Sequence, residues 1–248
     1  MKTGRRRTAE LLVLLLLVLA IDGFLFCLMG LPRFEDTEKQ KEWAGLDLLK
    51  KYQDNHDMVG WLQVDGTGIN YPVMRGEKYL YRNFRGQHNA SGSLFVEENW
   101  EEGDLCTLIY GHNMWMYGTM LHPLHRFEKE VFFRKNRTIR FYVVVEGGRT
   151  AEKRTYEIMC CSGTSVDQWN YASCQYICSQ EELDAFAEEC RARAIRERAF
   201  DGPCKEIIVL STCSSHVRNG KDRLLVVGKL ADRKAQTRID VLQPTKTD

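Results

Sequence analysis

The chain has 248 residues, with 35 lysines and arginines against 34 aspartates and glutamates, so its formal net charge is +1 at pH 7. A balance this close to neutral gives no electrostatic basis for binding nucleic acid. The apolar content of 44% is that of a folded protein and excludes a largely disordered chain.

The N-terminal region contains an apolar segment, residues 11–31, which follows basic residues at positions 2 and 5–7. As a helix it would be about 32 Å long, enough to cross a hydrocarbon core of about 30 Å. The positive-inside rule then predicts a single-pass protein of the cell membrane, with residues 1–10 in the cytoplasm and the chain after Pro32 outside. A signal peptide cleaved after Ala20 is the alternative, although the apolar run continues beyond that residue.

A polar helix is expected next, at about residues 36–56, within a stalk region of residues 32–58. Trp43, Leu46 and Leu49 recur at helical spacing, which indicates one apolar face that packs on the following domain. A plain stalk that only holds this domain away from a membrane is the alternative.

From residue 59 the pattern changes to short apolar strands separated by turns, so we expect a domain of residues 59–232 and a loose polar tail of residues 233–248. Many strands and few long helices favour a mainly β barrel or sandwich. Helices are expected near residues 118–127 and 180–200, the second with Ser179 and Glu182 as its capping box. The expected strands are residues 60–64, 69–74, 93–96, 106–110, 138–146, 155–162, 206–212 and 224–230.

The chain has nine cysteines. An exported domain could join some of them in disulfides, but we favour the interpretation that most are small buried apolar side chains. No Cys-x-x-Cys pair accompanies a matching pair of histidines, so no zinc site is expected. Apart from Cys27 and Cys213, the cysteines are Cys106, Cys160, Cys161, Cys174, Cys178, Cys190 and Cys204.

Three side chains at strand ends have the chemistry of a cysteine-based acyl-transfer site: Cys213, His112 and Arg223. A thiol attacks a carbonyl as the thiolate, which a neighbouring cation such as Arg223 would favour. The guanidinium could also hold the oxyanion that forms on attack, because it points several donors at one oxygen. Taken singly, each residue has an ordinary alternative as a buried cysteine, a polar histidine or a surface arginine.

Three motifs surround these residues: Leu210-Ser211-Thr212-Cys213, Tyr110-Gly111-His112 and the Arg-x-x-Val-Val-Gly strand of residues 223–228. In these motifs, and in residues 69–73 and 79–84, the chain resembles a class B sortase, a cysteine transpeptidase. The similarity extends from residue 59 to about residue 230. It implies an eight-stranded β-barrel of the sortase type, with an N-terminal helix and a helix inserted between strands 6 and 7.

The resemblance implies that the enzyme cleaves a C-terminal sorting motif of surface proteins after its threonine, and that Cys213 holds the acyl-enzyme. His112 would protonate the leaving amine and later deprotonate the incoming amine. That amine would belong to a cell-wall precursor, lipid-linked peptidoglycan, at a Gram-positive surface. No metal or other cofactor is implied.

The substrate groove is expected beside these strand ends. Its residues would be Leu80, Thr164, Tyr171, Ser211 and Thr212. The segment 163–180 mixes apolar surface with hydrogen-bonding tips, as a peptide groove needs. Simple packing of Trp169 and Tyr171 against the inserted helix is the alternative.

Two other functions stay open. One is polymerisation of pilins, with a pilin lysine as the amine. The other is a catalytically dead surface-binding module, against which the intact set of Cys213, His112 and Arg223 argues. An acidic third member of the site is in doubt, because Cys213 is followed by Ser-Ser-His, and Asp104 and Asp222 are candidates only by default.

Overall fold

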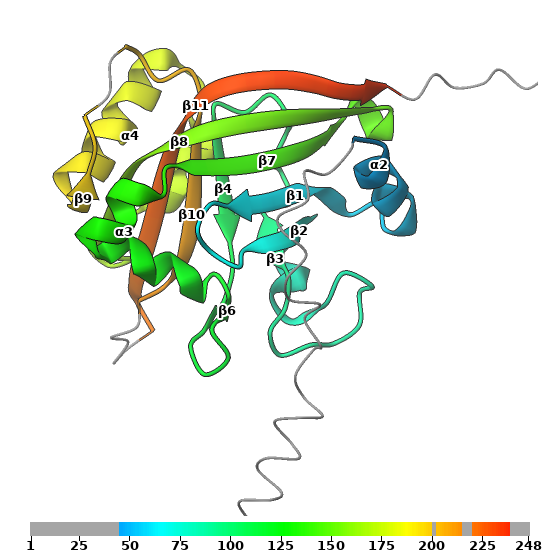
Figure 1. Ribbon diagram of the computed structural model, residues 1–248, viewed down its shortest axis with the longest axis horizontal. Coiled ribbons are helices and arrows are strands. Elements are labelled where there is room, and N and C mark those ends of the chain that lie inside the picture. Colours follow the sequence, from blue (N-terminus) through cyan, green and yellow to red (C-terminus); the bar gives the residue numbers. More distant parts are fainter. Residues whose placement is uncertain (1–44, 200–201, 215–219, 239–248) are drawn as a thin grey trace, which may run out of the picture. The chain divides into compact units, whose positions relative to one another are not determined.

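The protein is described by a computed structural model that covers residues 45–199, 202–214 and 220–238 (Figure 1). It is mainly β, and it confirms the expected fold class. Eight strands form a closed barrel: β1 (Met58–Val64), β2 (Asn70–Arg75), β3 (Leu94–Val96), β4 (Cys106–Tyr110), β7 (Thr138–Val145), β8 (Thr150–Ser165), β10 (Ile207–Cys213) and β11 (Asp222–Arg238).

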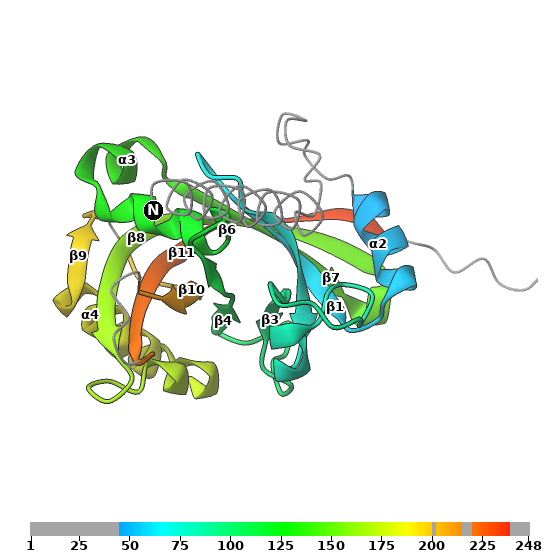
Figure 2. The same cartoon turned by 90° about the horizontal axis from the view of Figure 1, so that it is seen from below.

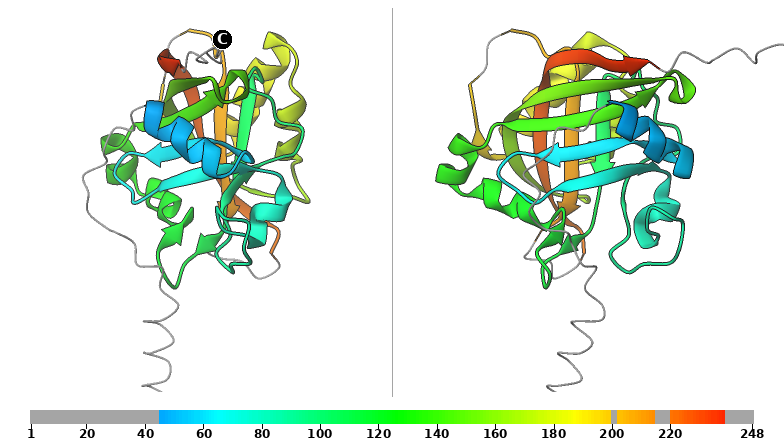
Figure 3. Two further views of the ribbon diagram at one scale, coloured as in Figure 1. Left: turned by 90° about the vertical axis from the view of Figure 1, so that its right-hand side faces the viewer. Right: turned by 45° about the vertical axis from the view of Figure 1, so that its right-hand side comes forward.

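The barrel closes because its two terminal strands pair with each other. The strand order is β11-β10-β4-β3-β2-β1-β7-β8, and β8 pairs in turn with β11 (Figure 3). The β10–β4 and β2–β3 pairs are parallel. A short strand, β9 (Ala194–Glu197), lies against the outer edge of β8. The parallel β4–β10 pair matters most for function, because both strands end at the same end of the barrel.

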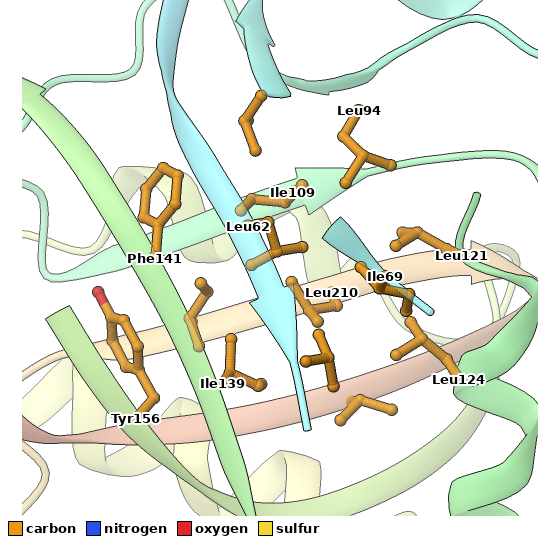
Figure 4. Close-up of a cluster of buried hydrophobic side chains, with 14 of the residues drawn as sticks. Leu62, Ile69, Leu94, Ile109, Leu121, Leu124, Ile139, Phe141, Tyr156 and Leu210 are labelled. Atoms are coloured by element: carbon orange, nitrogen blue, oxygen red, sulfur yellow. The ribbon is translucent and has the colours of Figure 1, made fainter. Parts of the chain in front are cut away.

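The two faces of each strand lie in different apolar environments. On β10, Ile208 and Leu210 belong to the cluster that fills the barrel, whereas Ile207 and Val209 belong to a second cluster outside it. This is the alternation expected of a strand that is buried on both faces. Figure 4 shows the interior cluster, with side chains contributed by strands all around the barrel and by the segment that carries Leu121 and Leu124.

Helices cover the outside of the barrel at opposite sides (Figure 1). Helix α2 (Gly45–Asp54) buries Leu48 and Leu49 against a cluster that includes Tyr142. Helix α4 (Gln180–Ala192) lies between β8 and β10 in the chain and covers the second cluster. Its N-terminus has the expected capping box, because the Ser179 side chain accepts from the Glu182 N–H and the Glu182 carboxylate accepts from the Ser179 N–H.

The helical segments differ from the sequence-based expectation in two places. The expected helix 180–200 ends at Ala192, and the chain then forms β9. The expected helix 118–127 begins as a hairpin of β5 (Asn113–Met114) and β6 (Thr119–Met120), because Gly118 adopts a positive φ of 66° that suits a turn. Short helices follow the hairpin: the 3-10 helix η2 (His122–Glu128) and α3 (Glu130–Lys135).

The C-terminal end also differs. β11 continues to Arg238, paired with β8 as far as Thr150, so part of the expected loose tail is strand. The remaining short elements are the 3-10 helices η1 (Glu77–Tyr81), η3 (Glu146–Gly148) and η4 (Tyr171–Tyr176).

The expected membrane localisation requires correction. Within the ranges that the structure describes, no helix is both long and apolar enough to cross a bilayer. Helix α4, with 13 residues, spans about 20 Å, short of the roughly 30 Å of a hydrocarbon core. This finding contradicts the predicted single-pass protein with its catalytic domain outside the cell. Residues 11–31, on which that prediction rested, lie outside the described residues.

Candidate active site

The strand register brings the three proposed catalytic residues into one row. Cys213, the last residue of β10, lies directly opposite Arg223 of β11. On the other side of β10, Ser211 pairs with Tyr110 of the parallel strand β4. Two residues beyond this pair are Cys213, the last residue of β10, and His112, just past the end of β4. Neighbouring strands lie about 4.8 Å apart, so the backbone of Cys213 lies between those of His112 and Arg223.

The row lies on the outer face of the barrel. Cys213 has the same parity on β10 as Val209, which belongs to the outer cluster, and Arg223 has the same parity on β11 as Leu225 of that cluster. The row continues to Thr164 of β8, which lies opposite Arg223. Figure 2 shows β8, β11, β10 and β4 side by side, so four neighbouring strands contribute one residue each.

Gly111 holds the position of His112 beyond the end of β4. Its N–H donates to the Ser211 carbonyl at 3.2 Å, and its own carbonyl accepts from Thr212 Oγ1 at 2.9 Å. A Cβ added at Gly111 would lie 2.4 Å from the Leu94 side chain and 2.8 Å from Leu121. Only glycine therefore fits between the His112 strand end and the barrel core.

His112 is half-buried and its imidazole is held in place. Its Nε2 lies 3.0 Å from the Leu80 carbonyl oxygen, and its ring lies 5.4 Å from the exposed ring of Tyr81. Because a carbonyl can only accept, Nε2 carries a proton and Nδ1 is the nitrogen that gains or loses one. Burial lowers the pKa of His112 below its usual 6.5, and the bond to the Leu80 carbonyl only partly opposes this.

Arg223 is partly buried, and backbone carbonyls fix its guanidinium. Nη1 donates to the carbonyl oxygen of Gly220 at 2.7 Å and to that of Asp222 at 3.1 Å. The guanidinium also interacts with the Tyr171 hydroxyl. Burial raises the pKa of Tyr171, and the hydrogen bond to Ser211 and the positive charge of Arg223 oppose that rise.

Cys213 differs from the other cysteines in exposure. All eight cysteines in the described ranges are free thiols. Six are buried, Cys178 is exposed and Cys213 is intermediate. Burial raises the pKa of the Cys160 thiol to about 12 and that of Cys161 further, so these buried thiols stay protonated and unreactive.

The expected substrate-binding residues fall into two groups. Thr164, Tyr171 and Ser211 lie on the outer face with Cys213, and the hydroxyls of Tyr171 and Ser211 are 2.9 Å apart. Thr212 has the opposite parity on β10, and its hydroxyl bonds the Gly111 carbonyl. Leu80 is half-buried and reaches the site through its carbonyl, which holds His112.

Trp169 packs against α4. Its ring stacks on Phe186 with 5.4 Å between centroids, and the Arg193 guanidinium lies 4.6 Å from its centroid. Neither default acidic candidate has a carboxylate contact with Cys213, His112 or Arg223 among the described hydrogen bonds and ion pairs. Asp104 accepts from the Glu101 N–H, and Asp222 contributes its backbone carbonyl, not its carboxylate, to Arg223 and Ser214.

Two polar side chains lie against the Cys213 carbonyl and two more contact them, and none of the four was predicted as a site residue. Asn113 Nδ2 donates to the Cys213 carbonyl at 3.0 Å, and His125 Nε2 lies 3.2 Å from the same oxygen. His122 contacts Asn113, and Glu128 contacts His125. The only sequence signal was two histidines spaced i,i+3 on a short segment, which is weak alone. In the part of the chain that the structure describes, no group of three or more histidine, cysteine or acidic residues is arranged to hold a metal ion.

Comparison with known proteins gives consistent matches. A family model described as a sortase domain matches residues 62–231, a range that contains His112, Cys213 and Arg223. Sortase B of Staphylococcus aureus (strain NCTC 8325 / PS 47) is 26% identical over 205 residues, which cover 80% of this chain and 75% of that protein. The crystal structure of Clostridium perfringens sortase B has a TM-score of 0.65 at 28% identity, covering 74% of this chain and 98% of that one. A Staphylococcus aureus sortase B–substrate complex also gives 0.65, at 25% identity, covering 77% and 87%.

Proposed function

The chain belongs to the sortase family and is a cysteine transpeptidase similar to class B sortases, and we propose that Cys213, His112 and Arg223 carry out its reaction. Sortases act on sorting-signal substrates and amine nucleophiles. The observation that carries the assignment is the row of three residues at the ends of adjacent strands, with Cys213 in the middle.

In the first half of the reaction, His112 Nδ1 takes the proton of the Cys213 thiol, and the thiolate attacks the carbonyl carbon of the threonine in the sorting motif. The C–S bond forms, and the carbonyl electron pair moves to the oxygen. When this intermediate collapses, the C–N bond breaks and His112 Nδ1 gives its proton to the departing amine. The acyl group is then a thioester on Cys213.

In the second half, an amine of a cell-wall precursor attacks the thioester. His112 Nδ1 takes the proton that this amine loses, the C–S bond breaks and a new amide bond forms. The released Cys213 thiolate takes this proton back from His112, so the thiol and the neutral imidazole are restored together, and no net oxidation or hydrolysis is required.

Arg223 is the group best placed to stabilise the oxyanion. In many cysteine and serine acyl-transfer sites, the backbone N–H groups near the nucleophile form the oxyanion hole. Here the N–H of Ser214 donates to the Asp222 carbonyl at 3.0 Å, so it is already engaged. The guanidinium, which lies opposite Cys213, has five N–H donors in a fixed plane and retains donors beyond those that bind carbonyls.

The test is cleavage of a peptide library by the purified protein, with the products read by mass spectrometry. We expect cleavage after threonine in peptides of the Thr-Gly or Thr-Asn type, and formation of an amide product when a glycine-based amine is added. A product formed only with a lysine side-chain amine would favour pilin polymerisation instead. Absence of cleavage, with unchanged peptide binding, would favour the catalytically dead binding module.

A further inference from the structure

The carbonyl oxygen of Cys213 is held by side chains from the β5–β6 hairpin and η2. Asn113 Nδ2 lies 3.0 Å from this oxygen, and His125 Nε2 lies 3.2 Å from it. The contacts continue outward in both directions. His122 Nδ1 is 2.7 Å from Asn113 Oδ1, and His125 Nδ1 is 2.8 Å from Glu128 Oε1.

One arrangement of protons gives every donor in this chain an acceptor. His122 Nδ1–H donates to Asn113 Oδ1. The two hydrogens of the Asn113 amide go to the Cys213 carbonyl and to His125 Nε2, which are 3.0 and 3.1 Å away. His125 Nδ1–H donates to the Glu128 carboxylate. The reversed amide would place Oδ1 against the Cys213 oxygen, and two acceptors in contact repel.

The centre of the network is shielded from water, and its outer end is not. The His125 side chain is only 11% exposed, whereas that of Glu128 is 33% exposed. Burial makes each hydrogen bond stronger than in water, and it makes an unpaired group costly. The Cys213 carbonyl therefore accepts from the Asn113 amide, and His125 and Glu128 hold that amide from behind.

The opposite end of the same peptide group is also fixed. The peptide bond that follows Cys213 presents its carbonyl to Asn113 and its N–H, that of Ser214, to the Asp222 carbonyl at 3.0 Å. β10 ends at Cys213, so without these contacts the backbone at the thiol would have no partner on the hairpin side. The orientation of this peptide plane sets the direction of the Cα–Cβ bond, and hence of Sγ.

We propose that Asn113, His125 and Glu128 are positioning residues for Cys213, which fix its backbone so that Sγ is aimed at the scissile carbonyl. The inference rests on the proposed function, because it takes Cys213 as the nucleophile. Two consecutive residues therefore have different roles. His112 transfers protons in the reaction, and Asn113 holds the backbone of Cys213. The acidic residue that the sequence left unidentified is Glu128, which acts through His125 and does not touch the substrate.

The test compares three kinds of variant in kcat, in KM and in the rate at which a small alkylating reagent modifies Cys213. Asn113→Asp keeps the shape of the side chain but cannot donate to the Cys213 carbonyl, and His125→Phe removes both ring nitrogens. Misplacing a reacting atom by about 1 Å costs up to roughly 10²-fold in rate. We therefore expect kcat to fall about tenfold or more in both variants, with KM changed less than about threefold. Alkylation of Cys213 should stay near the wild-type rate, because a small reagent can reach Sγ from many directions.

Glu128 provides the rescue arm. Glu128→Gln keeps an oxygen that accepts from His125, so it should retain most of the activity, whereas Glu128→Ala should lower kcat as His125→Phe does. The matched control is His56→Gln. His56 is exposed and its ring contacts Tyr52 of α2, away from Cys213, so this variant should keep the wild-type kcat and alkylation rate.

Two results would overturn the inference: wild-type kcat in Asn113→Asp and His125→Phe, or a loss of kcat matched by an equal loss in alkylation, which would mean that the network controls thiol ionisation. Cleavage retained by Cys213→Ala would instead refute the proposed function itself.

Discussion

His112 is half-buried beside Leu80, and this burial lowers its pKa below 6.5. Folding therefore favours the neutral imidazole, and the unfolded chain binds more protons than the folded one as the pH falls toward 6.5 and below. The sign of the linkage follows: the stability that the neutral form contributes is present above pH 6.5 and is lost as the pH falls through the lowered pKa.

We expect this loss to appear in the melting temperature. Between pH 7.5 and pH 5, the Tm of the wild-type protein should fall more than that of His112→Gln, which has no group to titrate at this position. His122, whose pKa is also lowered by burial, is present in both proteins and cancels in the comparison. Parallel Tm curves for the two proteins would show that His112 is not held neutral by the fold.

A substitution at Arg223 can show whether catalysis requires the planar guanidinium or only a positive charge. Arg223→Lys keeps a positive charge opposite Cys213 but replaces a planar fork of donors with a single ammonium. If the guanidinium holds the oxyanion, kcat should fall by about 10²-fold, the usual cost of losing an oxyanion donor. Steady-state kinetics with a sorting peptide would measure this. A near wild-type kcat in the lysine variant would mean that charge alone is needed.

Thiol exposure makes Cys213 selectively reactive. In a Cys178→Ser background, which removes the exposed thiol, a thiosulfonate reagent should modify Cys213 well before any buried cysteine of the described ranges. Peptide mapping after brief exposure would identify the modified residue. Preferential modification of Cys160 or Cys161 would contradict the burial and raised pKa of those thiols.

At the scale of elements, the segment between β8 and α4 contains two aromatic residues with different neighbours. Trp169 stacks on Phe186 of α4, whereas the Tyr171 hydroxyl bonds Ser211 one row below Cys213. Trp169→Ala should therefore lower Tm and leave peptide preference unchanged. Tyr171→Phe keeps the ring in its buried position but frees Ser211 and Arg223, so KM should rise or peptide preference change with only a small loss of Tm. The reverse pattern would place the substrate groove elsewhere.

The strands were predictable because apolar runs bounded by turn residues are easily recognised in the sequence. All eight barrel strands lie at the positions of such runs. The short elements were not. β5 and β6 have two residues each, too few for any periodicity. β9 follows α4 directly, and its pairing with β8 is a tertiary contact that no local pattern shows.

The same distinction holds for the site. Cys213, His112 and Arg223 stand at strand ends within recognisable motifs, so they could be proposed from the sequence. Asn113, His125 and Glu128 could not, because Asn113 meets Cys213 only when the parallel β4–β10 pair forms. Thr212 shows the converse, since a motif residue next to the nucleophile lies on the other face of its strand.

At the scale of the whole molecule, a buried ion network stands at the end of the barrel away from Cys213. Glu206, just before β10, accepts from Arg154 at 3.2 Å and from the Tyr156 hydroxyl. β10 has seven residues, which places this network about 20 Å from the thiol. The network therefore joins β8 to the start of β10 without touching the site.

Glu206→Ala removes one of the two carboxylates that pair with the buried Arg154, the other being that of Glu152. Breaking a buried pair costs up to about 3–5 kcal/mol. Chemical denaturation should show this loss, while kcat of the folded protein stays near wild type. Asp54→Ala removes an exposed ion pair with Lys51 and should change stability little. Equal effects of the two substitutions would mean that the buried network does not stabilise the barrel.

The most direct test of the proposed chemistry is to locate the acyl group. The protein is mixed with a sorting peptide in the absence of an amine, quenched in acid within the first turnover and analysed by mass spectrometry, intact and after digestion. We expect a mass increase equal to the peptide fragment that ends in threonine, attached to Cys213 and released by added amine. Cleavage without any adduct on Cys213, or an adduct on a different residue, would contradict the proposed acyl-enzyme.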